Sequence, residues 1–200
     1  MKKKNIFIIY AVLSFIFTSC INDFQEITIY PYKVGDFYSE GGAMGIVYKV
    51  SDDGAHGMIV SLNEAECAWG DTILTLANDT LDAINNINKI KQIDQWKQKF
   101  PAFYWCDNKN KDGVSGWCLP SKNDWEEILE NRFIIDETLV DIGAQSILGK
   151  TYWSSTEYSK YEAYHVDFIL AEMQFYAVKL NRKKVFVRAE LGIDLKIILG

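Results

Sequence analysis

Alternation of apolar and polar residues predicts two blocks of β-structure. In the first, two runs rich in β-branched side chains, 45–51 and 57–62, flank Asp52-Asp53-Gly54, a tight-turn sequence typical of a hairpin. The second block begins near residue 151. Its four expected strands are 152–158, 163–168, 173–180 and 185–191. Because the connections between them are short, we expect these four to form an antiparallel meander.

Between the two blocks, apolar residues recur at helical spacing. Helices are expected from Leu81 (capped by Asp79 or Thr80), from Pro101, after Ser121 and over 136–142. Ser121 with Asp124 three residues later forms a capping box, and Trp125 opens the apolar face of that helix. Strands, then helices, then strands predict an α+β fold in which two or three helices pack on a mostly antiparallel sheet.

The N-terminus has the pattern of a bacterial lipoprotein signal peptide, expected over residues 1–19. A basic start, Lys2-Lys3-Lys4, precedes an apolar run too short to span a bilayer comfortably, and Phe17-Thr18-Ser19-Cys20 resembles a lipobox. We expect Cys20 to carry lipid, residues 20–31 to form a tether, and 32–200 to form the domain. A signal-anchor helix with a chance cysteine is the alternative. The lipid would hold the protein to a membrane, at the outer membrane or cell surface.

The net charge of the chain disfavours some classes of binding partner. The chain has 21 basic and 27 acidic residues, and removal of the leader with its three lysines leaves 18 against 27, a net of −9. A domain this acidic is a poor partner for nucleic acid or sulfated polysaccharide, although a local basic patch can still exist.

Besides Cys20, the expected lipidation site, three cysteines follow the leader: Cys67, Cys106 and Cys118. An odd count allows at most one internal disulfide, and Cys106 with Cys118 is the candidate pair because they bracket a turn-rich loop. The alternative is three small buried thiols. Neither the cysteine spacing nor His56 and His165 has a metal-ligand pattern, so no metal or cofactor is expected.

Four segments together carry a family resemblance: "GWCLPSKNDWEEI", "YWSSTEY", "AYHVDF" and "VFVRAEL". They are similar to the C-type-lectin-like domain found at the C-terminus of bacterial collagen-like surface proteins and in many exported lipoproteins. The resemblance covers about residues 32–191 and implies a lectin-like α+β fold. Two departures stand out: Cys118 replaces the family's Tyr, and the second Arg of its closing motif is missing after Ala189.

The members of that family with a described activity resemble adhesins that bind host glycans. The loops with which calcium-dependent lectins bind sugars, Glu-Pro-Asn or Gln-Pro-Asp with Trp-Asn-Asp, do not occur here, so binding is expected to be calcium-independent. The candidate ligand surface comprises Ser155, Thr156, Tyr158, Asn181 and Arg182. Alternatively, the hydroxyl groups of this set satisfy loop backbone beside a sheet.

The large side chains of the same motifs are expected inside. Trp117, Trp125 and Trp153 should meet in one core, with Trp153 packed on the helix that follows Ser121. Arg188 is expected to form a buried ion pair or loop clamp.

The leading function hypothesis is therefore a non-enzymatic surface module that binds glycan or an envelope protein. The alternative is a structural or assembly subunit of an envelope complex. A formylglycine-generating type of oxidase, which would use Cys106 and Cys118, is weaker because no second signature of that family follows. No catalytic residue is assigned, since no nucleophile-elbow pattern occurs.

Overall fold

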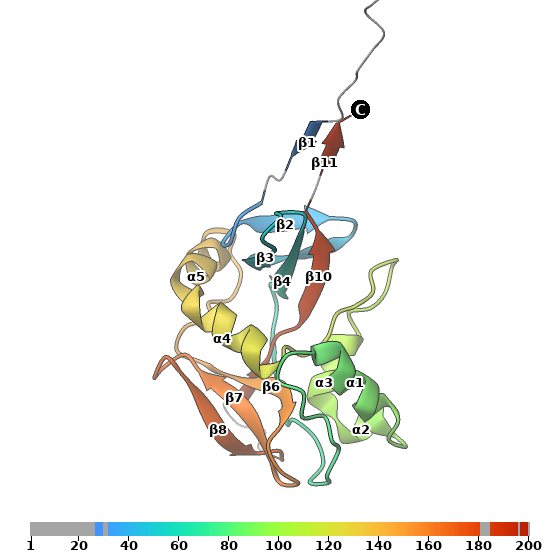
Figure 1. Ribbon diagram of the computed structural model, residues 1–200. Coiled ribbons are helices and arrows are strands. Elements are labelled where there is room, and N and C mark those ends of the chain that lie inside the picture. Colours follow the sequence, from blue (N-terminus) through green and yellow to red (C-terminus); the bar gives the residue numbers. More distant parts are fainter. Residues whose placement is uncertain (1–26, 30–31, 181–184, 196, 200) are drawn as a thin grey trace, which may run out of the picture. The chain divides into compact units, whose positions relative to one another are not determined.

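The computed structural model describes residues 27–29, 32–180, 185–195 and 197–199 (Figure 1). Its contacts divide the chain into two units. The smaller contains an antiparallel ribbon of β1 (Ile27–Ile29) and β11 (Ile197–Leu199). The larger, Tyr30–Lys196, contains all other elements. The predicted signal peptide, Cys20 and most of the tether lie outside the described residues.

One sheet of the larger unit has four antiparallel strands in the order β10-β4-β3-β2. These are β2 (Phe37–Glu40), β3 (Ala43–Val50), β4 (His56–Ser61) and β10 (Glu190–Asp194). The predicted hairpin is confirmed: β3 and β4 pair across the turn at 51–55, where Asp53 accepts a hydrogen bond from the backbone of Ala55.

The other sheet has five strands in the order β5-β9-β6-β7-β8. These are β5 (Ala65–Glu66), β6 (Thr151–Glu157), β7 (Glu162–Asp167), β8 (Glu172–Val178) and β9 (Val185–Val187). The meander of β6, β7 and β8 is as predicted. The fourth predicted strand is not one strand, because β9 pairs in parallel with β6 while β10 crosses into the other sheet. The change of sheet occurs at Arg188, whose buried side chain is described below.

Five helical segments complete the unit: α1 (Ala83–Lys91), α2 (Trp96–Lys99), α3 (Pro101–Asp107), α4 (Lys122–Glu130) and α5 (Arg132–Asp141). The α+β class is confirmed. Helix α4 begins with the predicted capping box between Ser121 and Asp124. Helix α1 begins two residues later than predicted, with Asp82 as its N-cap. Figure 1 shows α4 and α5 on one side of the unit and α1–α3 on the other.

The interior consists of two clusters of buried side chains. Trp125 of α4 stacks on Tyr152, with ring centroids 5.0 Å apart, in a cluster with Phe168. Trp117 and Trp153 belong to the other cluster. The expectation that Trp125 and Trp153 share one core is therefore wrong. Neighbouring residues of a strand point to opposite faces, so Tyr152 faces α4 while Trp153 faces away from it.

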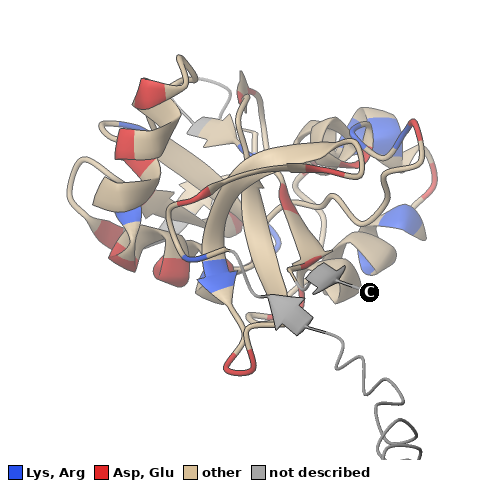
Figure 2. Ribbon diagram, turned by 90° about the horizontal axis from the view of Figure 1, so that it is seen from above, with Lys and Arg blue, Asp and Glu red and all other residues tan. Residues whose placement is uncertain are grey.

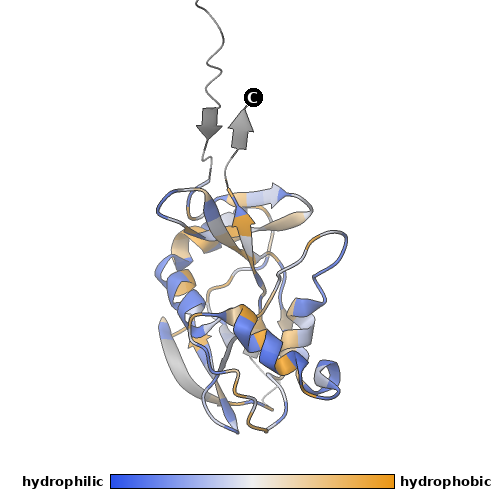
Figure 3. Cartoon of the chain, turned by 45° about the vertical axis from the view of Figure 1, so that its right-hand side comes forward, coloured by the Kyte–Doolittle hydropathy of each residue, from blue (hydrophilic) through white to orange (hydrophobic). Residues whose placement is uncertain are grey.

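Helices of the larger unit carry both hydrophilic and hydrophobic residues, as expected for helices with one face on a core (Figure 3). Within the described residues, no helix combines the length and apolar character that a membrane span requires.

Candidate ligand-binding site

A hollow of about 520 Å³ lies where the start of β3, the segment after β4 and the end of α3 come together. Its size is within the range of small-molecule sites. The side chains in its wall that can bind a ligand are Asn63, Trp105, Asn108, Lys109, Lys111 and Trp117.

Lys109 lies between two indole rings. Its Nζ is 4.4 Å from the ring centroid of Trp105 and 5.8 Å from that of Trp117, and it donates a hydrogen bond to Oδ1 of Asn63. Burial lowers the pKa of Lys109, because a desolvated ammonium group is less stable in its charged form. Within the described part of the chain Lys109 has no carboxylate partner.

The loop that carries Lys109 and Trp117 is fixed by short-range hydrogen bonds. The Asn110 side chain accepts from the backbone N–H of Trp117 at 2.7 Å and donates to its carbonyl at 3.0 Å. The backbone N–H of Lys109 donates to the carbonyl of Cys106, which continues the last turn of α3. The two tryptophans are thus held in place without any ligand.

The indole N–H groups of Trp105 and Trp117 differ from those of the other core tryptophans, although Trp117 is itself buried in the cluster of Trp69 and Trp153. The indole N–H groups of Trp69, Trp125 and Trp153 each donate to a backbone carbonyl, at 2.7–3.0 Å. In the described ranges, those of Trp105 and Trp117 donate to no protein group. Neither indole nitrogen is among the fully buried atoms that lack a partner in the described residues, so both N–H groups are open to solvent and can donate to water or to a ligand.

Arg188 holds the end of β4 and the residue after it, Ser61 and Leu62, which form part of the wall of the hollow. Its fully buried guanidinium donates to the carbonyls of Ser61 at 2.8 Å and Leu62 at 3.2 Å, and to that of Gln145 at 2.6 Å. Nη2 and Nε also bind Oε2 of Glu64, at 2.9 and 3.2 Å. The prediction of a buried ion pair that clamps loops is confirmed.

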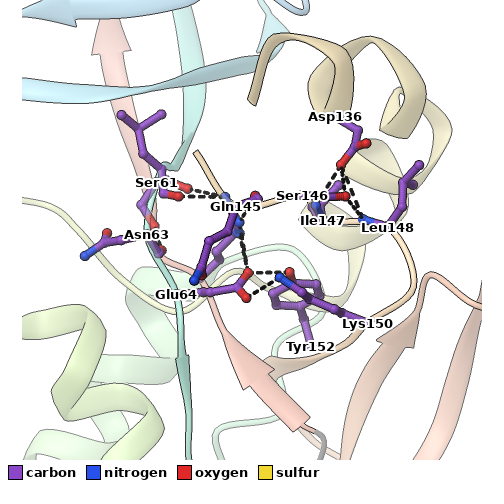
Figure 4. Close-up of polar contacts among 12 residues, drawn as sticks. Ser61, Asn63, Glu64, Asp136, Gln145, Ser146, Ile147, Leu148, Lys150 and Tyr152 are labelled. Atoms are coloured by element: carbon purple, nitrogen blue, oxygen red, sulfur yellow. Dashed lines mark hydrogen bonds and ion pairs between the residues drawn. The ribbon is translucent and has the colours of Figure 1, made fainter. Parts of the chain in front are cut away.

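Glu64 receives two further hydrogen bonds, from Lys150 at 2.5 Å and from the Tyr152 hydroxyl at 2.6 Å (Figure 4). Figure 4 shows the side chains of Asn63 and Glu64 directed away from each other. With Glu64 held inside by its cations, Asn63 is presented to Lys109 and the hollow.

A second hollow, of about 480 Å³, lies above a pair of acidic side chains, Asp124 and Glu190. Glu190 is buried and accepts hydrogen bonds from the Tyr48 hydroxyl at 2.5 Å and the Cys118 thiol at 3.6 Å. Burial, together with the charge of Asp124, raises the pKa of Glu190 well above its usual range. Because Tyr48 and Cys118 already donate hydrogen bonds to Glu190, its carboxyl group needs no ligand, and this hollow is a weaker candidate than the first.

The predicted ligand surface is corrected at two positions. Ser155 and Thr156 are buried, and both hydroxyl groups are used internally. The hydroxyl of Ser155 accepts from Asn86 at 3.0 Å, and that of Thr156 donates to the carbonyl of Asp79 at 2.9 Å. These hydroxyl groups therefore satisfy loop backbone and a neighbouring polar group, as the alternative interpretation proposed for the set.

The other predicted surface residues lie away from the hollow or outside the described ranges. Tyr158 is 48% exposed and contacts Tyr164 edge to face, with ring centroids 5.4 Å apart. Asn181 and Arg182 lie outside the described residues.

The predicted disulfide is not formed. Cys106 and Cys118 are free thiols, as is Cys67. Cys106 and Cys118 are buried in the same apolar cluster, and burial raises the pKa of both thiols, which keeps them protonated and unreactive. Among the described residues, no three His, Cys, Asp or Glu side chains are grouped as metal ligands would be.

The sequence did not single out Trp105 and Lys109, which lie in a segment expected to be a short helix and a surface loop. Charge distribution is the signal that could have found them. Residues 83–111 contain six Lys and two Asp, a local net charge of +4 in a chain of net −6. Residues 122–141 contain seven acidic and two basic residues, a net charge of −5. Figure 2 shows the acidic residues on the helices at the left and blue segments on those at the right.

No family model and no curated protein matches the chain. Among solved structures, the fold is similar to that of a fimbrial protein from Bacteroides ovatus ATCC 8483, with a TM-score of 0.60 and 18% identity. The likeness covers 81% of this chain and 49% of that protein, so this chain spans about half of its length. At this identity the likeness shows a shared fold.

Proposed function

We propose that the protein is a surface-located, lipid-anchored binding module, and that the hollow between Trp105 and Trp117 binds a glycan. The observation that carries the proposal is the pair of indoles with unused N–H donors in the wall of one hollow. Aromatic faces and a few fixed polar groups are what small-ligand sites combine.

Two further observations support a sugar as the ligand. Asn63 and Asn108 supply amide groups that can donate to and accept from hydroxyl groups, beside the ammonium of Lys109. The segments that resemble C-type-lectin-like adhesins support the same ligand class, and the absence of calcium-loop motifs supports binding without calcium. The proposed role needs no enzymatic step.

A glycan array probed with the full chain in detergent micelles tests this function, with and without a chelator. We expect the array to show bound glycans, with signals unaffected by the chelator and lost in Trp105→Ala. Trp96→Ala is the matched control, because Trp96 is also partly buried against the same cluster but does not line the hollow. A folded protein that binds no glycan, or equal loss in both variants, contradicts the proposal.

The lipid anchor is tested separately. Cys20→Ala should abolish incorporation of labelled fatty acid and release the protein from the membrane fraction. Retention of label in this variant would contradict anchoring at Cys20.

The fold shared with a fimbrial protein favours a second candidate, an assembly subunit of a surface structure. Strand β2 lies at one edge of its sheet and β8 at an edge of the other, and exposed edges are where further strands can add. Cross-linking of intact cells should then capture this chain in a discrete envelope complex, whereas a monomer under these conditions contradicts that candidate.

A further inference from the structure

We propose that the sugar bound in this hollow carries a carboxylate, and that Lys109 is the residue that binds it. The inference rests on the proposed function and adds the chemical class of the ligand. Its starting point is a half-buried cation that has no carboxylate partner among the described residues.

The surroundings of Lys109 are electrostatically incomplete. Burial has the largest effect in lowering the pKa of its ammonium group; the cations Arg188 and Lys111 lower it further, and Cys106 acts in the opposite direction. Asn63 offers a neutral oxygen to one of the three N–H donors. A carboxylate in the hollow would supply the missing negative charge and would gain charge-assisted hydrogen bonds in a partly desolvated site.

The same residues define where a sugar ring would lie. Trp105 and Trp117 both come within 5.8 Å of the Lys109 ammonium group, measured to the ring centroids. Trp117 is only 6% exposed and Trp105 is half-buried, so a sugar would contact the accessible part of Trp105, where a substituent comes within reach of Lys109. The exposed Lys111, in the wall of the same hollow, adds a second positive charge.

Local charge favours an acidic sugar without favouring a polyanion. Residues 83–111, whose C-terminal part lines the hollow, have a net charge of +4, but the whole chain has a net charge of −6. A long polyanion would meet the acidic remainder of the surface, for example the seven acids of 122–141. One or two carboxylated residues would meet Lys109 and Lys111, the charged side chains that line the hollow.

Titration of the full chain with methyl β-D-glucuronide, methyl β-D-glucoside and acetate tests the proposal. The first two probes differ chiefly in the carboxylate, and acetate offers the carboxylate without the ring. We expect the glucuronide to bind about tenfold or more tightly than either of the others, as a charge-assisted hydrogen bond predicts.

Lys109→Met should remove this preference by weakening glucuronide binding to about the level of the glucoside, while Lys109→Arg should retain the preference. The matched control is Lys97→Met, since Lys97 also lies over a tryptophan ring, that of Trp96, at 5.9 Å but outside the hollow. It should bind like the wild type.

Each other outcome overturns a different statement. Equal binding of glucuronide and glucoside overturns the carboxylate while leaving the proposed function standing. Equal binding of acetate and glucuronide shows an anion site that does not read the sugar. No binding of either sugar, together with a silent glycan array, overturns the proposed function itself.

Discussion

The buried Lys179 and the half-buried Lys109 each lie over a tryptophan ring, in two regions of the protein that give them different hydrogen-bond partners. Nζ of Lys179 lies 4.6 Å from the ring centroid of Trp69, and Nζ of Lys109 lies 4.4 Å from that of Trp105. Burial lowers the pKa of both. Lys179, however, donates to the carboxylate of Glu157 at 2.5 Å and to the carbonyls of Ile73 and Lys160, whereas Lys109 has a single amide oxygen.

Lys179 therefore stabilises the fold, whereas Lys109 remains available to a ligand. Glu157 also accepts hydrogen bonds from the backbone N–H groups of Thr75 and Leu76, so the Lys179–Glu157 pair fixes the loop at 71–79 to the sheet. All of its polar atoms are used. Lys109, by contrast, donates one hydrogen bond within the described residues, to Asn63, and its other donors are available to solvent or to a ligand.

Removal of the carboxylate at Glu157 should have the largest effect. Glu157→Gln leaves the buried ammonium of Lys179 without its counter-ion, and we expect the free energy of unfolding to fall by about 3–5 kcal/mol. Urea denaturation measures it. Lys160→Met, at an exposed neighbour, should change stability by less than about 0.5 kcal/mol. Equal effects of the two substitutions would show that the pair does not hold the fold.

Arg188→Lys should have the next largest effect, because an ammonium group cannot reproduce the planar set of donors. We expect a loss of about 1.5–3 kcal/mol in unfolding free energy. Since Arg188 holds Ser61 and Leu62, this variant should also weaken glycan binding although it removes no side chain from the wall of the hollow. Unchanged binding at reduced stability would show that the wall is set by other contacts.

Glu190 adds a pH dependence that neither lysine explains. Its pKa is raised in the folded protein, so the folded state holds a proton that the unfolded state releases above the ordinary value of 4.5. Stability from this group is full below that pH and is lost as pH rises toward the folded pKa. Glu190→Gln cannot ionise, so the difference in unfolding free energy between variant and wild type should move in favour of the variant as pH rises. A difference independent of pH would contradict a protonated Glu190.

Local patterns were sufficient for much of the fold. The hairpin around Asp53, the capping box at Ser121 and the meander from residue 151 each depend on residues within one or two elements, and the structure contains all three. The transfer of the chain between sheets at Arg188 depends on Ser61, Glu64 and Gln145, which lie far away in sequence. Pattern along one strand cannot show such contacts.

The site was less accessible to prediction for the same reason. Hydroxyl groups at Ser155 and Thr156 looked suitable for a ligand, but their partners Asn86 and Asp79 are more than sixty residues away and cover them. Conversely, Lys109 lies in a charged loop sequence, and its contact with Asn63 becomes visible only when β4 ends beside α3.

Lys109→Met should have the smallest effect on stability. The change in unfolding free energy should be zero or positive, in contrast to the loss expected when the Lys179–Glu157 pair is broken. The lowered pKa means that the charged lysine weakens the folded state at neutral pH, and that stability is regained as pH rises through the folded pKa toward 10.5. Methionine retains the apolar stem and removes the charge. We therefore expect an unfolding free energy at pH 7 that is unchanged or higher, by no more than about 0.5 kcal/mol. A clear loss of stability in urea would place Lys109 beside Lys179 as a residue that holds the fold, and would remove the reason to assign it to a ligand.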